Sequence, residues 1–206
     1  QLSDNMMPVP RPASPVAMAS LWAALALLWI FLLLPLVGWR ENMSERLADT
    51  LFVVELASLV FSGLCAALAA FFFAIPDHHK RPTERILAAL SLGIWLVLVL
   101  HCLVFATKEE ALEEFQRFNP GFYCTTTVIG LGLIPAVFGV ILLRRLAPTQ
   151  PVMTSFLVIL AAFTFGVFGC RLHHGDVPMY ILIWQYAPAF FAALIAALLG
   201  NKLLRW

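Results

Sequence analysis

The chain has 206 residues, of which 62% are hydrophobic and 12% are charged, and its mean hydropathy is +0.90. Soluble domains are about half apolar and about a quarter charged, so this composition excludes an ordinary water-soluble globule and indicates a membrane protein. The net charge of +1 gives no basis for nucleic-acid binding, and the four cysteines contain no CxxC pair, which excludes a zinc-ribbon spacing.

Six stretches of mostly apolar residues follow one another along the chain. Each approaches the roughly 20 residues that a helix needs to cross a bilayer. The apolar runs are continuous and do not alternate, which favours helices over the strands of a barrel. The predicted spans are residues 17–38, 51–75, 86–107, 123–143, 152–169 and 179–200.

The predicted fold is therefore all-α, a polytopic membrane bundle of six transmembrane helices with short loops. Residues 17–206 form this transmembrane domain, and residues 1–16 form a polar, proline-rich N-terminal segment. The longest connection, residues 108–122, has an apolar spacing that predicts a short amphipathic helix on the membrane surface, ended by Asn119-Pro120-Gly121.

The distribution of basic residues predicts the orientation. The segments on the same side as the two termini hold eight lysines and arginines, and the opposite segments hold five. Since cytoplasmic loops carry the excess of basic residues, both termini are predicted to be cytoplasmic. The eight are Arg11, Lys80, Arg81, Arg85, Arg144, Arg145, Lys202 and Arg205, and the five are Arg40, Arg46, Lys108, Arg117 and Arg171.

Thiol, imidazole and carboxylate groups gather near the outer ends of the predicted spans. The candidate signal-sensing residues are Cys124, Cys170, His173, His174 and Asp176. A second candidate site, polar and within the membrane, comprises Glu55, His101 and Cys102. A carboxylate within a span is costly to bury, so Glu55 is expected to have a partner.

Two kinds of chemistry fit the sensing residues. Thiolate and imidazole are ligands for soft metal ions such as zinc, copper or cadmium, so a transient metal ion is expected at Cys124, Cys170, His173 and His174. Two cysteines in an oxidising compartment can instead form a disulfide. Packed helices usually lie about 8–10 Å apart, whereas a disulfide needs Cα atoms within about 7 Å. This slightly favours the thiol–imidazole arrangement, while ordinary burial of the cysteines as small apolar residues stays open.

Several segments, in the right order, resemble the NrsF-like family of bacterial membrane anti-sigma factors. They are CRLHHGDVPMYILIWQY (170–186), LLGNKLLRW (198–206), PVPRPASP (8–15), ERLADTLFVVELA (45–57), LRRLAP (143–148) and Cys124 with the span that follows it. The resemblance covers nearly the whole chain. It implies a multi-pass protein of the bacterial inner membrane that holds an extracytoplasmic-function sigma factor inactive, without contacting nucleic acid. A stress signal such as a heavy metal or an oxidant would release that partner. Separately from the resemblance, residues 1–16 are the longest of the predicted cytoplasmic segments and could order on binding, so they are the leading candidate for the contact, helped by the basic loops.

The resemblance also implies that paired cysteines take part in sensing. The first family cysteine matches Cys124. The second usually lies in a His-Cys-Pro-type segment, and this chain has His174 at that place. Cys170 lies four residues earlier, so either it replaces the second thiol or a Cys–His metal site replaces the dithiol.

Two other classes of function are alternatives to a regulatory binding protein. A transporter should show a polar path through the middle of the membrane, usually with broken helices, and the polar residues in mid-span are few. A membrane thiol oxidoreductase would need paired cysteines in its outer loops and a quinone or haem site. The sequence contains no Walker loop, HExxH, GxSxG or CxxC motif, which favours a protein that is not an enzyme.

The predicted orientation can be tested with reporter fusions at Gln1 and Trp206. Because both ends are predicted to be cytoplasmic, alkaline phosphatase fused at either end should be inactive and a green fluorescent protein should fluoresce. Phosphatase activity at one terminus would contradict this orientation.

Overall fold

The computed structural model describes residues 14–40, 42–75, 82–106, 118–173 and 177–205, with the side chains of residues 118–120 left aside. Within these ranges all regular structure is helical, and six helical stretches are long and apolar enough to cross a membrane. The predicted all-α bundle with six spans is therefore confirmed. The predicted surface helix falls mostly on residues 107–117, which lie outside the described residues.

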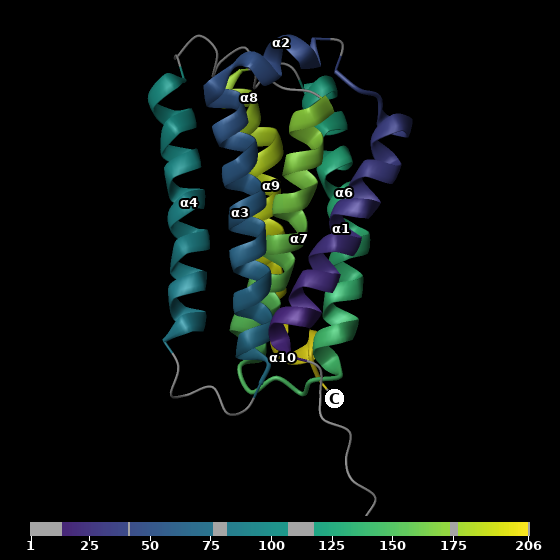
Figure 1. Cartoon of the computed structure of the whole chain (residues 1–206), viewed down its shortest axis with the longest axis vertical. Helices are drawn as coiled ribbons and strands as arrows, with labels where there is room; N and C mark the ends of the chain where they lie inside the picture. The colour runs from purple at the N-terminus through teal and green to yellow at the C-terminus, as the bar shows by residue number, and fades with distance from the viewer. Residues whose placement is uncertain (1–13, 41, 76–81, 107–117, 174–176, 206) are drawn as a thin grey trace, which may run out of the picture.

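The first four spans are α1 (Pro15–Val37), α3 (Thr50–Phe73), α4 (Thr83–Phe105) and α6 (Phe118–Arg144). The fifth is α7 (Pro151–His173), and the sixth is composed of α8 (Pro178–Ile181), the π-helix η2 (Leu182–Tyr186) and α9 (Ala187–Leu198). Two short helices, α2 (Met43–Ala48) and α10 (Gly200–Leu203), lie at opposite ends of the bundle (Figure 1). We call the end that carries α2 and α8 the upper end, and the end that carries α10 the lower end.

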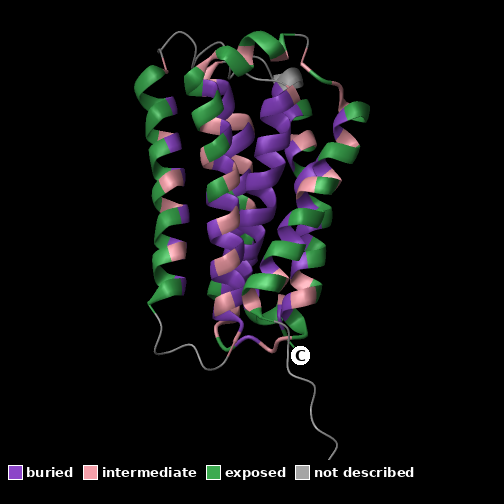
Figure 2. Ribbon diagram, viewed as in Figure 1, coloured by how far each residue is buried: buried purple, intermediate pink, exposed green. Residues whose placement is uncertain are grey.

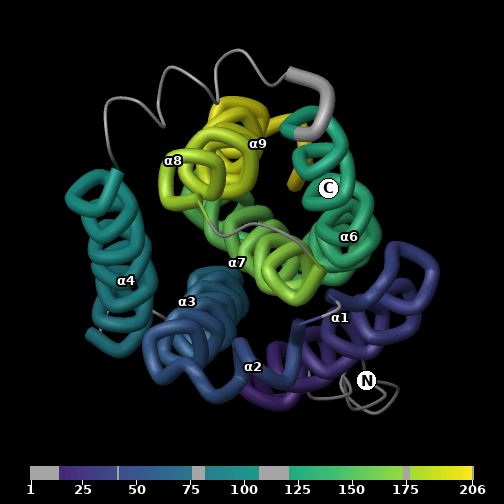
Figure 3. Tube along the Cα trace, turned by 90° about the horizontal axis from the view of Figure 1, so that it is seen from above, coloured from purple at the N-terminus to yellow at the C-terminus, as the bar shows by residue number. Residues whose placement is uncertain are grey.

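The helix α7 forms the centre of the bundle. Seen along the bundle axis, α1, α3, α6 and α9 surround it, while α4 stands outside this ring and packs mainly on α3 (Figure 3). In the most apolar stretch of α7, 83% of the residues are buried, against 28% for α1 and for α4. The buried surface follows α7 along its length, whereas the outer helices expose apolar faces as expected for contact with lipid (Figure 2).

Local chemistry explains where the spans begin and end. The Ser14 side chain accepts a hydrogen bond of 3.2 Å from the backbone N–H of Ala17, and Pro15 occupies the first helical position, where its missing N–H costs nothing. The helix α6 begins at Phe118, five residues before the predicted start, because Pro120 in the first turn is compatible with a helix. The helix α7 runs four residues past the predicted end at Gly169, which places Cys170 and Arg171 inside the helix.

The helices α6 and α7 approach each other closely at Gly166. A Cβ atom at this position would lie 2.6 Å from the carbonyl oxygen of Val128 and 3.1 Å from the backbone nitrogen of Gly132. These are backbone atoms that cannot rotate away, so only glycine fits. Small residues at such contacts let transmembrane helices pack backbone to backbone, and dispersion contacts then hold them together.

We expect Gly166→Ala to destabilise the bundle by about 1–3 kcal/mol, the usual cost of overpacking a core. The free energy of unfolding in detergent would measure the loss. Gly130→Ala on α6 is the matched control, because nothing lies within 4 Å of a Cβ atom there. Both substitutions gain the same helix propensity, so equal stability of the two variants would contradict the contact.

Candidate functional site

Two of the predicted sensing residues lie side by side at the upper end of the bundle. Cys124 is near the start of α6 and Cys170 is near the end of α7, and their sulfur atoms are 2.7 Å apart. The Cys170 sulfur also lies 3.8 Å from the carbonyl oxygen of Cys124. Both side chains are buried, with 2% and 0% of their surface exposed. Since a disulfide bond is about 2.05 Å long, a small movement would join the two thiols.

The Gly166 contact explains this proximity. The helices α6 and α7 are antiparallel, so the residues one turn above Val128 and Gly166 are Cys124 and Cys170. The usual spacing between helix axes, which the sequence predicts, would separate the two cysteines too far for a disulfide. Glycine at position 166 brings the two backbones closer than this usual spacing.

The described histidine of the sensing set has other partners. The Nδ1 atom of His173 lies 2.7 Å from the carbonyl oxygen of Gly38, the residue that ends α1, and the His173 ring packs against Tyr123. Among the described residues, no group of three or more His, Cys, Asp or Glu side chains is arranged to hold a metal ion. His174 and Asp176 lie outside the described residues, so a metal site that includes them stays a prediction.

Side chains of the sixth span also lie next to the thiols. The side chains of Tyr180 and Gln185 lie near the Cys124 thiol, and Gln185 is fully buried. Gln185 belongs to η2, a π-helical turn whose backbone carbonyl at Trp184 accepts a hydrogen bond of 2.8 Å from the Thr125 hydroxyl. Single π-helical turns within α-helices occur frequently at functional sites.

An ion pair lies on the other side of α7. The Arg171 guanidinium donates to both carboxylate oxygens of Glu55, at 2.9 Å and 2.7 Å, and the Tyr186 hydroxyl donates to the same carboxylate at 2.7 Å. Arg171 also lies over the Phe52 ring, 5.4 Å from its centroid. The Glu55 side chain is 19% exposed and that of Arg171 is 4% exposed. Glu55 therefore has the partner that its burial required.

The residues of the second candidate site share one cavity. Glu55, His101 and Cys102 line a cavity of about 290 Å³, together with Arg171 and Tyr186. Cys102 is buried, whereas His101 is exposed and its ring packs against Phe105. Sequence reasoning missed the two residues that complete this site: Arg171 was assigned to an outer loop, and Tyr186 sits in an apolar run that gives no signal.

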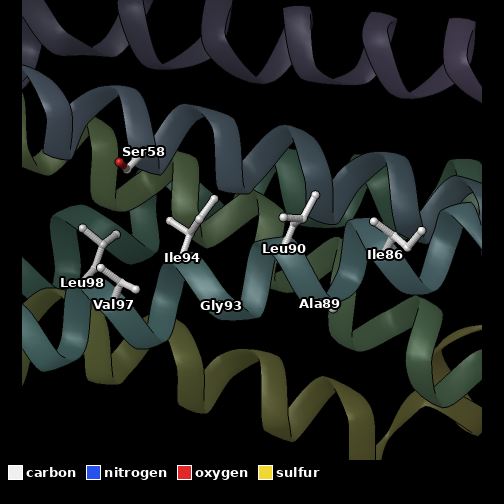
Figure 4. A pocket seen from close by; sticks show the side chains of 8 residues that line it. All are labelled: Ser58, Ile86, Ala89, Leu90, Gly93, Ile94, Val97 and Leu98. Atoms are coloured by element: carbon white, nitrogen blue, oxygen red, sulfur yellow. The ribbon is translucent and has the colours of Figure 1, made fainter.

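A larger hollow on the side of the bundle bears on the transporter hypothesis. It has a volume of about 560 Å³, lies along α4 beside α3, and is lined by apolar residues such as Ile86, Leu90 and Ile94 (Figure 4). Ser58 is the one hydroxyl in its lining. A lining of this kind matches lipid chains and does not provide the polar groups that a transport pathway requires.

Comparison with known proteins identifies the family of the chain. The profile of a family described as NrsF, negative regulator of sigma F, matches residues 2–206. The chain belongs to the NrsF family. Its role is therefore expected to be regulatory, in agreement with the resemblance noted in the sequence.

Two curated relatives extend over most of the chain. The probable anti-sigma-F factor NrsF of Azospira oryzae is 26% identical over 201 residues, which cover 96% of this chain and 91% of that protein. The anti-sigma-F factor NrsF of Caulobacter vibrioides is 24% identical over 180 residues, which cover 84% of this chain and 83% of that protein. No solved structure matches this NrsF-family chain.

The proximity of the two sulfurs predicts that diamide, a thiol oxidant, links Cys124 to Cys170 within one chain. Oxidised protein, unfolded in SDS and treated with N-ethylmaleimide, should take up two fewer maleimides than reduced protein. Cys124→Ser and Cys170→Ser should each abolish this loss. The control is a variant with both Cys65→Ala and Cys102→Ala, which should keep the loss of two maleimides. A loss that persists in Cys170→Ser would contradict the pairing of Cys124 with Cys170.

Proposed function

We propose that this chain is an integral-membrane anti-sigma factor. In this proposal it sequesters an extracytoplasmic-function sigma factor at the bacterial inner membrane and releases it when a heavy metal or an oxidant reaches the outer side. The observation that carries the proposal is the family match over residues 2–206, with relatives named anti-sigma-F factors. The six apolar helices support the membrane location.

In the proposed orientation the upper end faces the periplasm and the lower end faces the cytoplasm. Arg85, Arg144, Arg145, Lys202 and Arg205 all belong to the lower end, where an excess of basic residues is expected on the cytoplasmic side. The thiol pair then lies at the end that meets periplasmic signals. The sigma factor would bind at the lower end, through residues 1–16 and the basic surface.

The proposed mechanism is a change between two states of the bundle. A disulfide between Cys124 and Cys170, or a soft metal ion held by their thiolates, would shift the upper end of α7 relative to α6. The central helix continues to Pro151 at the lower end, where its first turns pack against the end of the chain. The Ser155 hydroxyl donates to the Ala196 carbonyl oxygen at 3.0 Å, and a Cβ atom at Gly200 would lie 2.8 Å from the Pro151 carbonyl oxygen. A movement of α7 would therefore change these contacts at the lower end, which is the surface assigned to the sigma factor.

Affinity purification of the full chain from membranes, followed by mass spectrometry, tests the proposal. A sigma factor should copurify from untreated cells and be lost after exposure to cadmium or diamide. Cys124→Ser and Cys170→Ser should each retain the sigma factor under both treatments, because serine keeps the size of the side chain but removes the thiolate. Cys65→Ala is the control and should respond as the parent does.

Two outcomes would contradict this function. Absence of any sigma factor from the purified protein would refute the anti-sigma role itself. Full release from both serine variants would keep that role and refute sensing by the two thiols.

Removal of residues 1–16 should release the sigma factor without a signal while the protein stays in the membrane, and unchanged retention would assign the contact to the rest of the lower end.

A further inference from the structure

Two pairs of consecutive residues connect the thiol pair to the buried ion pair. On α7, Cys170 contacts Cys124 while the next residue, Arg171, binds Glu55. On η2, Gln185 lies beside the Cys124 thiol while the next residue, Tyr186, donates to Glu55. Successive side chains of a helix point in different directions, so each pair reaches two different neighbours from one backbone turn.

We propose that Glu55, Arg171 and Tyr186 are positioning residues that set the thiol–disulfide equilibrium of Cys124 and Cys170. The proposal rests on the proposed function in one respect, namely that oxidation of these two thiols is the event that the protein registers. It assigns a role to the ion pair that goes beyond holding helices together.

The ion pair is fully formed while the thiols are reduced. Both oxygens of the Glu55 carboxylate are engaged, by two guanidinium nitrogens of Arg171 and by the Tyr186 hydroxyl. Bidentate pairs of this kind have a narrow range of good geometry, and a buried charge tolerates loss of its partner poorly. The network therefore stabilises the position that α7 and η2 have in the dithiol state.

In the proposed coupling, disulfide formation displaces the last turn of α7 slightly from this position. The thiols of Cys124 and Cys170 lose two protons and two electrons and become one S–S bond, and a disulfide oxidant such as oxidised glutathione accepts them and becomes two thiols. The sulfurs must close from 2.7 Å to about 2.05 Å. In the proposed coupling, closure draws the last turn of α7 toward α6, and Arg171 moves with it, away from Glu55 on α3.

The ion pair therefore opposes oxidation. Coupling between two sites is reciprocal, so a network that favours the dithiol state must also make the disulfide easier to reduce. The predicted effect of the network is a less negative reduction potential for the cysteine pair.

The test uses the purified full chain carrying Cys65→Ala and Cys102→Ala, so that Cys124 and Cys170 are the remaining thiols. The protein is equilibrated in glutathione buffers of graded potential, and the disulfide fraction is measured by maleimide labelling. The test variant is Glu55→Met/Arg171→Met, which leaves no unpaired charge. Relative to the parent, its equilibrium constant should favour the disulfide about tenfold more. This change corresponds to a reduction potential about 30 mV more negative.

Three further variants separate positioning from general stability. Tyr186→Phe removes one hydrogen bond to Glu55 and should shift the potential in the same direction by less. Arg171→Lys keeps the charge and should stay closer to the parent than the double variant does. Thr164→Val removes the hydroxyl that accepts a 3.0 Å hydrogen bond from Trp95 deeper on α7, and should lower stability without moving the potential.

Equal potentials for the parent and for folded Tyr186→Phe and double variants would overturn the coupling and leave the proposed function standing. If the double variant does not fold, Tyr186→Phe alone decides, since it changes a single hydroxyl. A shift of the same size in Thr164→Val would also overturn the proposal, because any weakening of the bundle would then suffice. A parent that forms no disulfide in any buffer would overturn both the coupling and the oxidant branch of the proposed function.

Discussion

The backbone contact between Gly166 and Val128 fixes how closely α7 lies against α6, and the geometry at the upper end depends on it. A side chain at position 166 would push the two helices apart. One turn above, the two cysteines meet only because the backbones are close there. A bilayer provides no hydrophobic force between helices, so contacts of this kind decide how spans are arranged.

The ion pair between Glu55 and Arg171 is the second constraint. In a membrane protein a charged side chain is accommodated when it faces the bundle interior and finds an opposite charge. These two residues are separated by 116 positions in the sequence, and their pairing ties the upper ends of α3 and α7 together. Tyr186 brings the sixth span to the same point. Three of the helices that meet at the upper end are thus joined by one polar network next to the thiols.

The extent to which the site was predictable differs from residue to residue. Cys124 and Cys170 were predictable as a candidate pair because both fall at outer ends of predicted spans. Their direct contact was not, because spacing between helices depends on which small residues face each other. Arg171 was predicted to lie in an outer loop because the fifth apolar run ends at Gly169, whereas the structure places it inside α7, buried and paired with Glu55.

The sequence by itself determined the number of spans and their helical form, because a continuous apolar run of bilayer length has one stable solution in lipid. Its short motifs also determined the family. It also determined that Glu55 needed a partner. Only the tertiary structure decided which partner that was, which cysteines touch, and that Gln185 and Tyr186 share a π-helical turn. The physical reason is that hydropathy acts on each helix alone, whereas helix spacing and rotation are set by side chains from distant segments that meet after the spans assemble.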